Sequence, residues 1–84
     1  MKDKVLVRVR LPMADLNYDV RLPADIPVSR VTDTLYQTLQ SLQKSPLPVK
    51  DRPVLWSMKN AKPLETDKTL RELGVTDSDM LFMI

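Results

Sequence analysis

The first quarter of the chain alternates between apolar and polar residues, which is the pattern of β-strands that bury one face. Residues 4–11 place four aliphatic side chains on one side: Val5, Val7, Val9 and Leu11. Residues 17–22 alternate in the same way, and the segment between the two runs contains the turn formers Pro12 and Asp15. Two alternating runs joined by a short connection predict an antiparallel β-hairpin.

Beyond Pro27 the period of the pattern changes to that of an amphipathic helix. Five apolar residues then form one stripe: Val28, Val31, Leu35, Leu39 and Leu42. Pro27 suits the start of a helix because its missing N–H has no intrahelical partner there. No typical N-cap side chain is evident at this start. Three prolines within residues 46–53 forbid continuation of the helix.

The second half of the chain predicts two short strands joined by a turn. Residues 53–58 form the third strand, and we expect its two sides to differ. One side holds Val54, Trp56 and Met58, and the other holds Leu55 and Ser57. Asn60 is suited to a left-handed conformation in the turn that follows. Residues 62–64 then form a very short fourth strand.

The segment before the final strand predicts one helical turn, at residues 66–75, closed by the only glycine, Gly74. Residues 79–84 predict the fifth strand, which ends in five consecutive apolar residues. Both faces of that strand are therefore apolar, so each face must be covered or must bind something. We expect a single domain over residues 1–84, with an α+β element order of ββαββ, a helical turn and β.

Composition excludes most catalytic and metal chemistry. The chain has no cysteine and no histidine, which removes thiolate nucleophiles, disulfides, and the commonest general base and transition-metal ligand. Asp77 and Asp79 flank a serine, but without further carboxylates at a loop spacing they predict a solvated turn rather than a calcium site. A net charge of +2 is too small for a dedicated nucleic-acid binder. We expect no enzymatic activity and no cofactor.

No stretch of the sequence is long and apolar enough to span a bilayer, and charges interrupt every apolar run near the N-terminus. The sequence therefore predicts a cytoplasmic protein.

The element order resembles the β-grasp fold of ubiquitin. The residues that carry the resemblance are those of the second half, including the segment Leu64–Leu70, which has the form L-x-x-x-x-T-L. The resemblance implies a mixed sheet in the order 2-1-5-3-4, with one α-helix on one face and a short helical turn before the last strand.

Within that fold the chain is most similar to the YukD/EsaB-like proteins of bacterial type VII secretion systems, to which the N-terminal domain of the membrane component EccD is related. The motif "YDVRLPADIPVSRV", residues 18–31, carries this resemblance. It implies a cytoplasmic, non-catalytic accessory or regulatory protein. Its partner would be a protein in the cytosolic part of the secretion machinery, and a homodimer is left open.

Two alternatives remain open at this point. Ubiquitin and its sulfur-carrier relatives extend beyond the last strand to a reactive Gly-Gly carboxylate, whereas this sequence ends at Ile84. A modifier would therefore need a tail beyond these residues. The chain would otherwise be a ubiquitin-like domain excised from a larger protein, such as a membrane transporter component.

The implied topology divides the strand residues between two faces of the sheet. We expect the helix side to hold Val5, Val7, Val9, Tyr18, Val20, Val54, Trp56, Leu81 and Met83. We expect the open side to form a protein-binding surface made of Leu6, Arg8, Arg10, Leu55, Met80, Phe82 and Ile84. Ubiquitin holds its partners on the equivalent face. The alternative is that the proline-rich loop 45–53 or a second copy covers this face.

Overall fold

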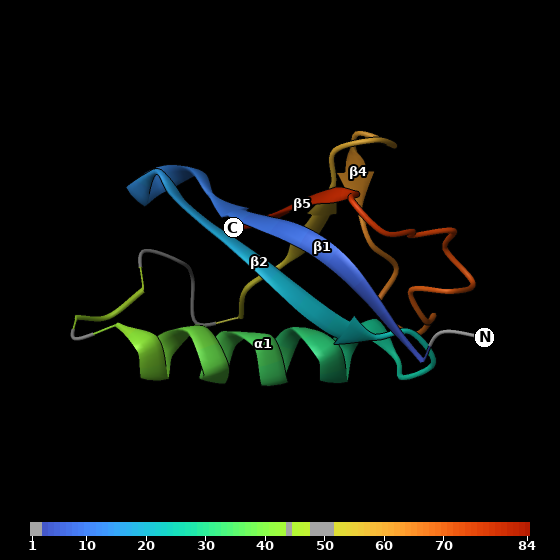
Figure 1. Ribbon diagram of the computed structural model, residues 1–84, viewed down its shortest axis with the longest axis horizontal. Helices are drawn as coiled ribbons and strands as arrows, with labels where there is room; N and C mark the ends of the chain where they lie inside the picture. The colour runs from blue at the N-terminus through green and yellow to red at the C-terminus, as the bar shows by residue number, and fades with distance from the viewer. Residues whose placement is uncertain (1–2, 44, 48–51) are drawn as a thin grey trace.

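The computed structural model describes residues 3–43, 45–47 and 52–84. Figure 1 shows a twisted sheet lying above one long helix. The elements are β1 (Lys4–Leu11), a 3-10 turn (Pro12–Ala14), β2 (Leu16–Pro23), α1 (Val28–Leu42), β3 (Leu55–Ser57), β4 (Lys62–Pro63) and β5 (Met80–Met83). The predicted elements are all present, although β3 and β5 are shorter than the sequence pattern suggests.

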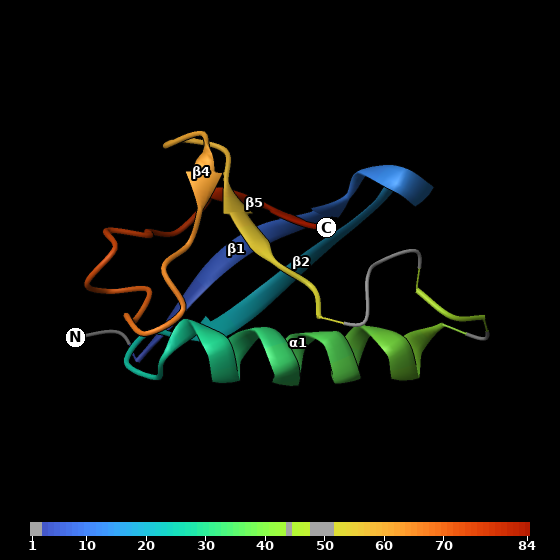
Figure 2. The same cartoon turned by 180° about the vertical axis from the view of Figure 1, so that it is seen from behind.

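The five strands form one mixed sheet in the predicted order, β2-β1-β5-β3-β4. β1 and β5 run parallel, and the other neighbouring pairs run antiparallel. α1 crosses one face of the sheet, as the opposite views in Figures 1 and 2 show. This arrangement confirms the predicted fold class and leaves β5 between two partners.

The hydrophobic core lies between α1 and the sheet. Its buried members are Val7, Val9, Leu11, Leu22, Val28, Val31, Leu35, Leu39, Leu47, Leu55, Leu64, Leu70, Val75, Leu81 and Met83. The alternation in β1 and the first four positions of the helical stripe are confirmed by this set. Val5, Tyr18 and Val20 are partly buried against it.

Leu42 does not belong to the core, contrary to the prediction from the helical stripe. Its side chain is 65% exposed, because the β1–β2 hairpin rises away from the last turn of α1 (Figure 1). Leu47 is buried instead, at 6% exposure, and its N–H donates to Oε1 of Gln40 at 2.9 Å. The described part of loop 45–53 therefore contributes Leu47 to the core between α1 and the sheet, and residues 48–51 lie outside the described residues.

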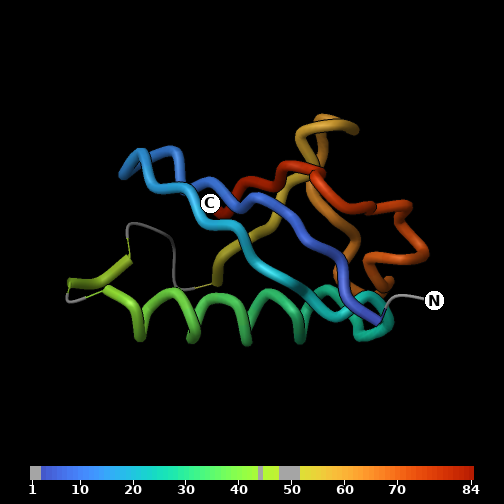
Figure 3. Tube along the Cα trace, in the orientation of Figure 1, coloured from blue at the N-terminus to red at the C-terminus, as the bar shows by residue number. Residues whose placement is uncertain are grey.

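The start of α1 has no side-chain cap, and backbone carbonyls of a distant segment replace it. The N–H of Val28 donates to the carbonyl of Lys68 at 2.8 Å, and that of Ser29 donates to Thr66 at 3.0 Å. The first N–H groups of a helix have no intrahelical partner, so these bonds satisfy two of them. The trace in Figure 3 shows this segment beside the start of α1.

Residues 69–75 form a single helical turn, in which the N–H of Leu73 donates to the carbonyl of Thr69 at 3.1 Å, whereas the prediction began the turn at residue 66. Both ends of the turn are capped. The N–H of Thr69 donates to Oε1 of Glu72, and the N–H of Glu72 donates to Oγ1 of Thr69, both at 3.1 Å. This reciprocal pair is a capping box. At the other end Gly74 has φ +74°, and the N–H of Val75 donates to the carbonyl of Leu70 at 3.0 Å. Such a left-handed residue commonly ends a helix.

An ion pair joins this turn to the junction before α1. Nε of Arg71 lies 2.7 Å from Oδ1 of Asp25, and Nη2 lies 3.1 Å from Oδ2. The backbone N–H of Arg71 also donates to the carbonyl of Ala24 at 3.0 Å. The hydrogen bond from Arg71 lowers the pKa of Asp25 and raises that of Arg71.

Gly74→Ala should lower the free energy of unfolding by about 1 kcal/mol, because alanine is strained at positive φ. A Cβ at this position would meet no heavy atom within 4 Å, so the loss comes from the backbone conformation. Ala61, rather than the predicted Asn60, is the left-handed residue of the β3–β4 turn, with φ 55°. Ala61→Gly should therefore shift urea-unfolding curves in the opposite direction. Shifts of the same sign would contradict this account.

Asp25 should titrate below the ordinary aspartate range. Because its folded pKa is lower than its unfolded pKa, its stabilising contribution is present above about pH 4 and is lost as the pH falls through the folded value. Carboxyl-carbon NMR titration checks this prediction. In Arg71→Gln the Asp25 pKa should rise toward its ordinary value, and an unchanged titration curve would contradict the assignment.

Candidate protein-binding face

The sheet face turned away from α1, called here the open face, can be followed across the strands by their register. Residues directly opposite each other in neighbouring strands share a face. Arg10 of β1 pairs with Phe82 of β5, Phe82 pairs with Trp56 of β3, and Trp56 pairs with Pro63 of β4. One row therefore runs from a cation over two aromatic side chains to a proline.

A second row lies beside the first. Asp19 pairs with Arg8, and Arg8 pairs with Met80. The N–H of Met58 donates to the carbonyl of Met80 at 3.2 Å, which places Met58 at the end of this row. Ile84 and Val54, which exchange backbone hydrogen bonds at 2.9 and 3.0 Å, flank the aromatic row on its other side.

The apolar members of these rows are accessible. Met58 is 52% exposed, Val54 40% and Ile84 38%, while Met80, Phe82 and Trp56 are half-buried. These six residues form a continuous group, called here the apolar patch, that extends over β5 and β3. Accessible groups of this kind on small proteins mark interaction sites.

The two sides of the third strand are the reverse of the prediction. Leu55 is 2% exposed and pairs with Met83, which is itself fully buried, so Leu55 belongs to the core and not to the open face. Trp56 instead lies on the open face, opposite Phe82. Val54 and Met58 lie on the open face with Trp56. Ser57 is buried, and its Oγ accepts a hydrogen bond from the N–H of Asn60 at 3.1 Å.

The error has a clear physical origin. A shift of one residue moves every side chain of a strand to the opposite face. Both sides of β3 carry large apolar residues, so hydrophobicity alone did not indicate the correct side. Ser57 does not indicate the side either, because a serine is more often exposed than buried and this one is buried. The pairing of β3 with β5 determines the side, and that pairing exists only in the folded sheet.

The other predicted site residues lie together on the open face. They are Leu6, Arg8, Arg10, Met80, Phe82 and Ile84. The register joins Arg8 and Arg10 directly to the apolar patch, whereas Leu6 is 41% exposed at the far end of β1. The residues that the sequence analysis missed are Trp56, Met58 and Val54.

The arginines of the open face are held by local carboxylates. Nε of Arg8 lies 3.1 Å from Oδ1 of Asp19, and Nη2 of Arg10 lies 3.2 Å from Oδ1 of Asp15. Both pairs are exposed, and exposed pairs contribute about 0–1 kcal/mol to stability. Their guanidinium groups therefore remain available to a partner that offers a better carboxylate.

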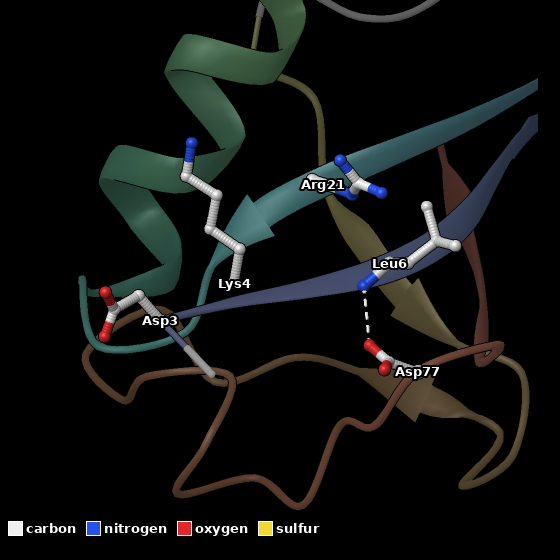
Figure 4. A pocket seen from close by; sticks show the side chains of 5 residues that line it. All are labelled: Asp3, Lys4, Leu6, Arg21 and Asp77. Carbon is white, nitrogen blue, oxygen red and sulfur yellow. Dashed lines mark hydrogen bonds between the residues drawn. The ribbon is translucent and has the colours of Figure 1, made fainter. Parts of the chain in front are cut away.

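A second group of charged side chains, two basic and two acidic, lies at the other end of the face around a hollow of about 460 Å³. Figure 4 shows its lining: Asp3, Lys4, Leu6, Arg21 and Asp77. Within the described part of the chain, Lys4 and Arg21 have no ion-pair partner. The cations Arg8, Arg10, Lys4 and Arg21 therefore lie on the β1 and β2 side of the apolar patch.

The carboxylates of Asp77 and Asp79 accept hydrogen bonds from backbone N–H groups. Oδ1 of Asp77 accepts the N–H of Leu6 at 2.9 Å, the dashed contact in Figure 4. Oδ2 of Asp79 accepts the N–H of Thr76 at 2.9 Å and lies 3.3 Å from Nζ of Lys59. In residues 3–43, 45–47 and 52–84 there is no cluster of side chains suited to a metal ion.

Comparison with known proteins identifies the family. Residues 6–83 match the family described as "WXG100 protein secretion system (Wss), protein YukD". The chain belongs to the YukD family. No curated protein gives a significant match to the sequence.

Solved structures place this YukD-family chain among the ubiquitin-like domains of type VII secretion systems. It is 30% identical, with a TM-score of 0.81, to a chain of the MycP5-free ESX-5 inner membrane complex, covering 99% of its own length and 21% of that chain. The EccD5 ubiquitin-like domain from Mycobacterium xenopi is 27% identical, with a TM-score of 0.78 and coverages of 99% and 94%. The EccD1 ubiquitin-like domain from Mycobacterium tuberculosis shares the fold at 18% identity, with a TM-score of 0.77 and coverages of 100% and 99%.

The YukD-family chain thus spans about a fifth of the length of its ESX-5 relative. Within the described residues, no helix has the length and apolar character needed to cross a membrane.

Leu55→Ala should lower the free energy of unfolding by about 2–5 kcal/mol, because it leaves a cavity in the core. Val54→Ala, on the accessible side of the same segment, should lower it by less than about 1 kcal/mol. Urea unfolding of the two variants measures the difference. A larger loss in Val54→Ala would show that the open and buried sides of β3 are assigned wrongly.

Proposed function

We propose that this YukD-family chain is a non-catalytic accessory or regulatory protein of a bacterial type VII secretion system, and that it acts in the cytoplasm by binding another protein. Family membership supports the connection to secretion. The relative in an ESX-5 inner membrane complex supports a partner within the secretion machinery.

The observation that carries the binding mode is the apolar patch. It places Trp56 and Phe82 side by side in the middle of the open face, with two methionines beside them. Tryptophan is enriched among residues that dominate binding energy, and methionine adapts its shape to a partner. Full burial of a large apolar side chain is worth about 1.5–3 kcal/mol. After the costs of association, a few such side chains support a micromolar contact, near 8 kcal/mol.

The charges around the patch specify the chemistry of the partner. Arg8 and Arg10 lie directly beside it, and Lys4 and Arg21 lie beyond Leu6. A partner surface with an apolar centre and an acidic rim complements this face. Such complementarity steers association and selects the partner. We therefore propose an apolar, acid-rimmed protein surface in the cytosolic part of the secretion machinery.

A second candidate is a ubiquitin-like domain within a larger protein, favoured by the small share of the ESX-5 relative that the chain covers. A conjugated modifier would require a Gly-Gly tail beyond Ile84, since Gly74 is the only glycine in the sequence. The length of the native open reading frame distinguishes these possibilities.

The double substitution Trp56→Ala with Phe82→Ala should weaken binding at least tenfold, since loss of a dominant interface residue costs about 2 kcal/mol or more. Binding is measured as co-purification with the detergent-solubilised type VII secretion complex of the same organism, with its components identified by mass spectrometry. Circular dichroism verifies that the variant is folded.

Leu42→Ala is the control, because Leu42 is an apolar residue at the end of α1, outside the open face, and is even more exposed than Trp56 and Phe82. Equal binding by a folded double variant, or an equal loss in Leu42→Ala, would refute the assignment of the apolar patch.

A further inference from the structure

We infer that the free edge of β2, with the groove between β2 and α1, is a second binding site, which takes an extended peptide segment of another protein. The segment would carry alternating aliphatic residues and flanking acidic residues. It would add a strand to the sheet beside β2. This site is separate from the apolar patch and does not depend on it.

The hydrogen bonds of β1 show which backbone groups of β2 bond to it and which point away from the sheet. On β1, the N–H of Leu6 donates to Asp77, the carbonyl of Leu6 accepts the N–H of Ser78, and the N–H of Arg8 donates to Asp79. The backbone N–H and C=O groups of the even-numbered β1 residues therefore point toward β5, and those of the odd-numbered residues point toward β2.

The register then assigns the groups of β2. Ala24 donates its N–H to the carbonyl of Asp3 at 2.9 Å, so the even-numbered residues of β2 bond to β1. Asn17, Asp19 and Arg21 point their N–H and C=O groups outward, away from β1. β2 is the last strand on its side of the sheet, and no strand of the described residues pairs with these groups. Exposed edges of this kind accept further strands.

The edge is long enough and has a defined end. β2 spans eight residues from Leu16 to Pro23, and its register with β1 continues without a bulge. Pro23 has no N–H to offer, so pairing must end there. An added strand would therefore align with residues 17–21.

Below this edge lies a hollow of about 110 Å³ between β2 and α1. Its lining is mainly aliphatic and includes two threonines from the helix. The lining residues are Val20, Arg21, Leu22, Pro23, Val31, Thr34, Leu35 and Thr38. Cavities of about 150 Å³ accept benzene, so this hollow suits one branched aliphatic side chain. Alternate residues of an added strand would point toward α1, which explains the preference for alternating aliphatic residues.

The charges near the groove favour an acidic flank. Arg21 borders this hollow and also lines the open-face hollow with Asp3 and Asp77, yet it has no ion-pair partner in the described residues. Arg30 lies one helical turn before Thr34 and is exposed. No carboxylate lines the hollow, and the carboxylate of Asp19 already pairs with Arg8 on the open face. Residues of the added strand that point away from α1 lie on the same side of the sheet as Arg21, which pairs with Leu6, so a carboxylate at one of these positions would meet this cation.

A second copy of the chain fits this edge less well. Antiparallel pairing of two β2 strands about a two-fold axis would bring two α1 helices together on the same face. The α1 residues next to the groove on that side are polar and exposed: Thr34, Thr38 and Ser41. Stable dimer interfaces are instead apolar at their centre, so we assign the edge to a peptide.

The test uses the 84-residue chain, labelled with nitrogen-15, and the capped peptide Asp-Glu-Val-Thr-Ile-Thr-Val-Glu. Binding should protect the amides of Asn17, Asp19 and Arg21 from hydrogen exchange. The amides of Tyr18, Val20 and Leu22 already bond to β1 and should show no comparable gain. This odd-numbered pattern is specific to strand addition. Protection without alternation, or no protection at millimolar peptide, would overturn the proposal.

Substitutions separate the groove from other surfaces. Thr38→Trp fills the hollow and should weaken peptide binding at least tenfold, whereas Gln37→Trp, on the solvent side of the same helix, should leave it within twofold. Arg21→Glu should weaken binding and Trp56→Ala should not, which keeps this result independent of the apolar patch. Equal peptide binding by Thr38→Trp and Gln37→Trp would refute the claim that the groove takes part in binding.

Light scattering of the free protein tests whether a second copy of the chain occupies the edge of β2. The free chain should be monomeric at the concentration used for NMR. A dimer that already protects Asn17, Asp19 and Arg21 would assign the edge to a second copy and overturn the peptide proposal.

Discussion

The position of β5 between β1 and β3 is the constraint on which the rest of the structure depends. Four residues, Met80–Met83, complete the sheet on both sides and supply both of its faces. Leu81 and Met83 are buried against α1, whereas Met80 and Phe82 support the open face. Since neighbouring strands share faces row by row, the register of β5 also determines which residues of β1 and β3 are accessible.

The segment between β4 and β5 holds the helix in place. Its carbonyls at Thr66 and Lys68 accept the first N–H groups of α1, and Arg71 binds the junction before α1 through both its backbone and its side chain. A helix that begins in solvent would rely on a side-chain cap for its first N–H groups. Here the cap is a tertiary contact, so the orientation of α1 and the path of the chain into β5 depend on each other.

The two proposed binding surfaces use different properties of the same sheet. The apolar patch presents side chains, and its selectivity would come from aromatic residues surrounded by arginines. The edge of β2 presents backbone groups, and its selectivity would come from the groove against α1 and from Arg21. Arg8 and Asp19 lie between the two surfaces. Both surfaces favour acidic partners, in keeping with the cations along β1 and β2.

The sequence alone determined the element order, the inward residues of β1 and most of the helical stripe, because periodicity reports burial directly where one side is polar. The ubiquitin-like fold came from the resemblance of the element order and of residues 64–70 to ubiquitin. It did not determine the sides of β3, the cap of α1, the exposure of Leu42 or the burial of Leu47. Each of these depends on a partner far along the chain: Met83 for Leu55, Lys68 for Val28, and the diverging hairpin for Leu42. Where both sides of an element are apolar, or where a backbone group bonds to a distant carbonyl, only the folded arrangement selects the outcome.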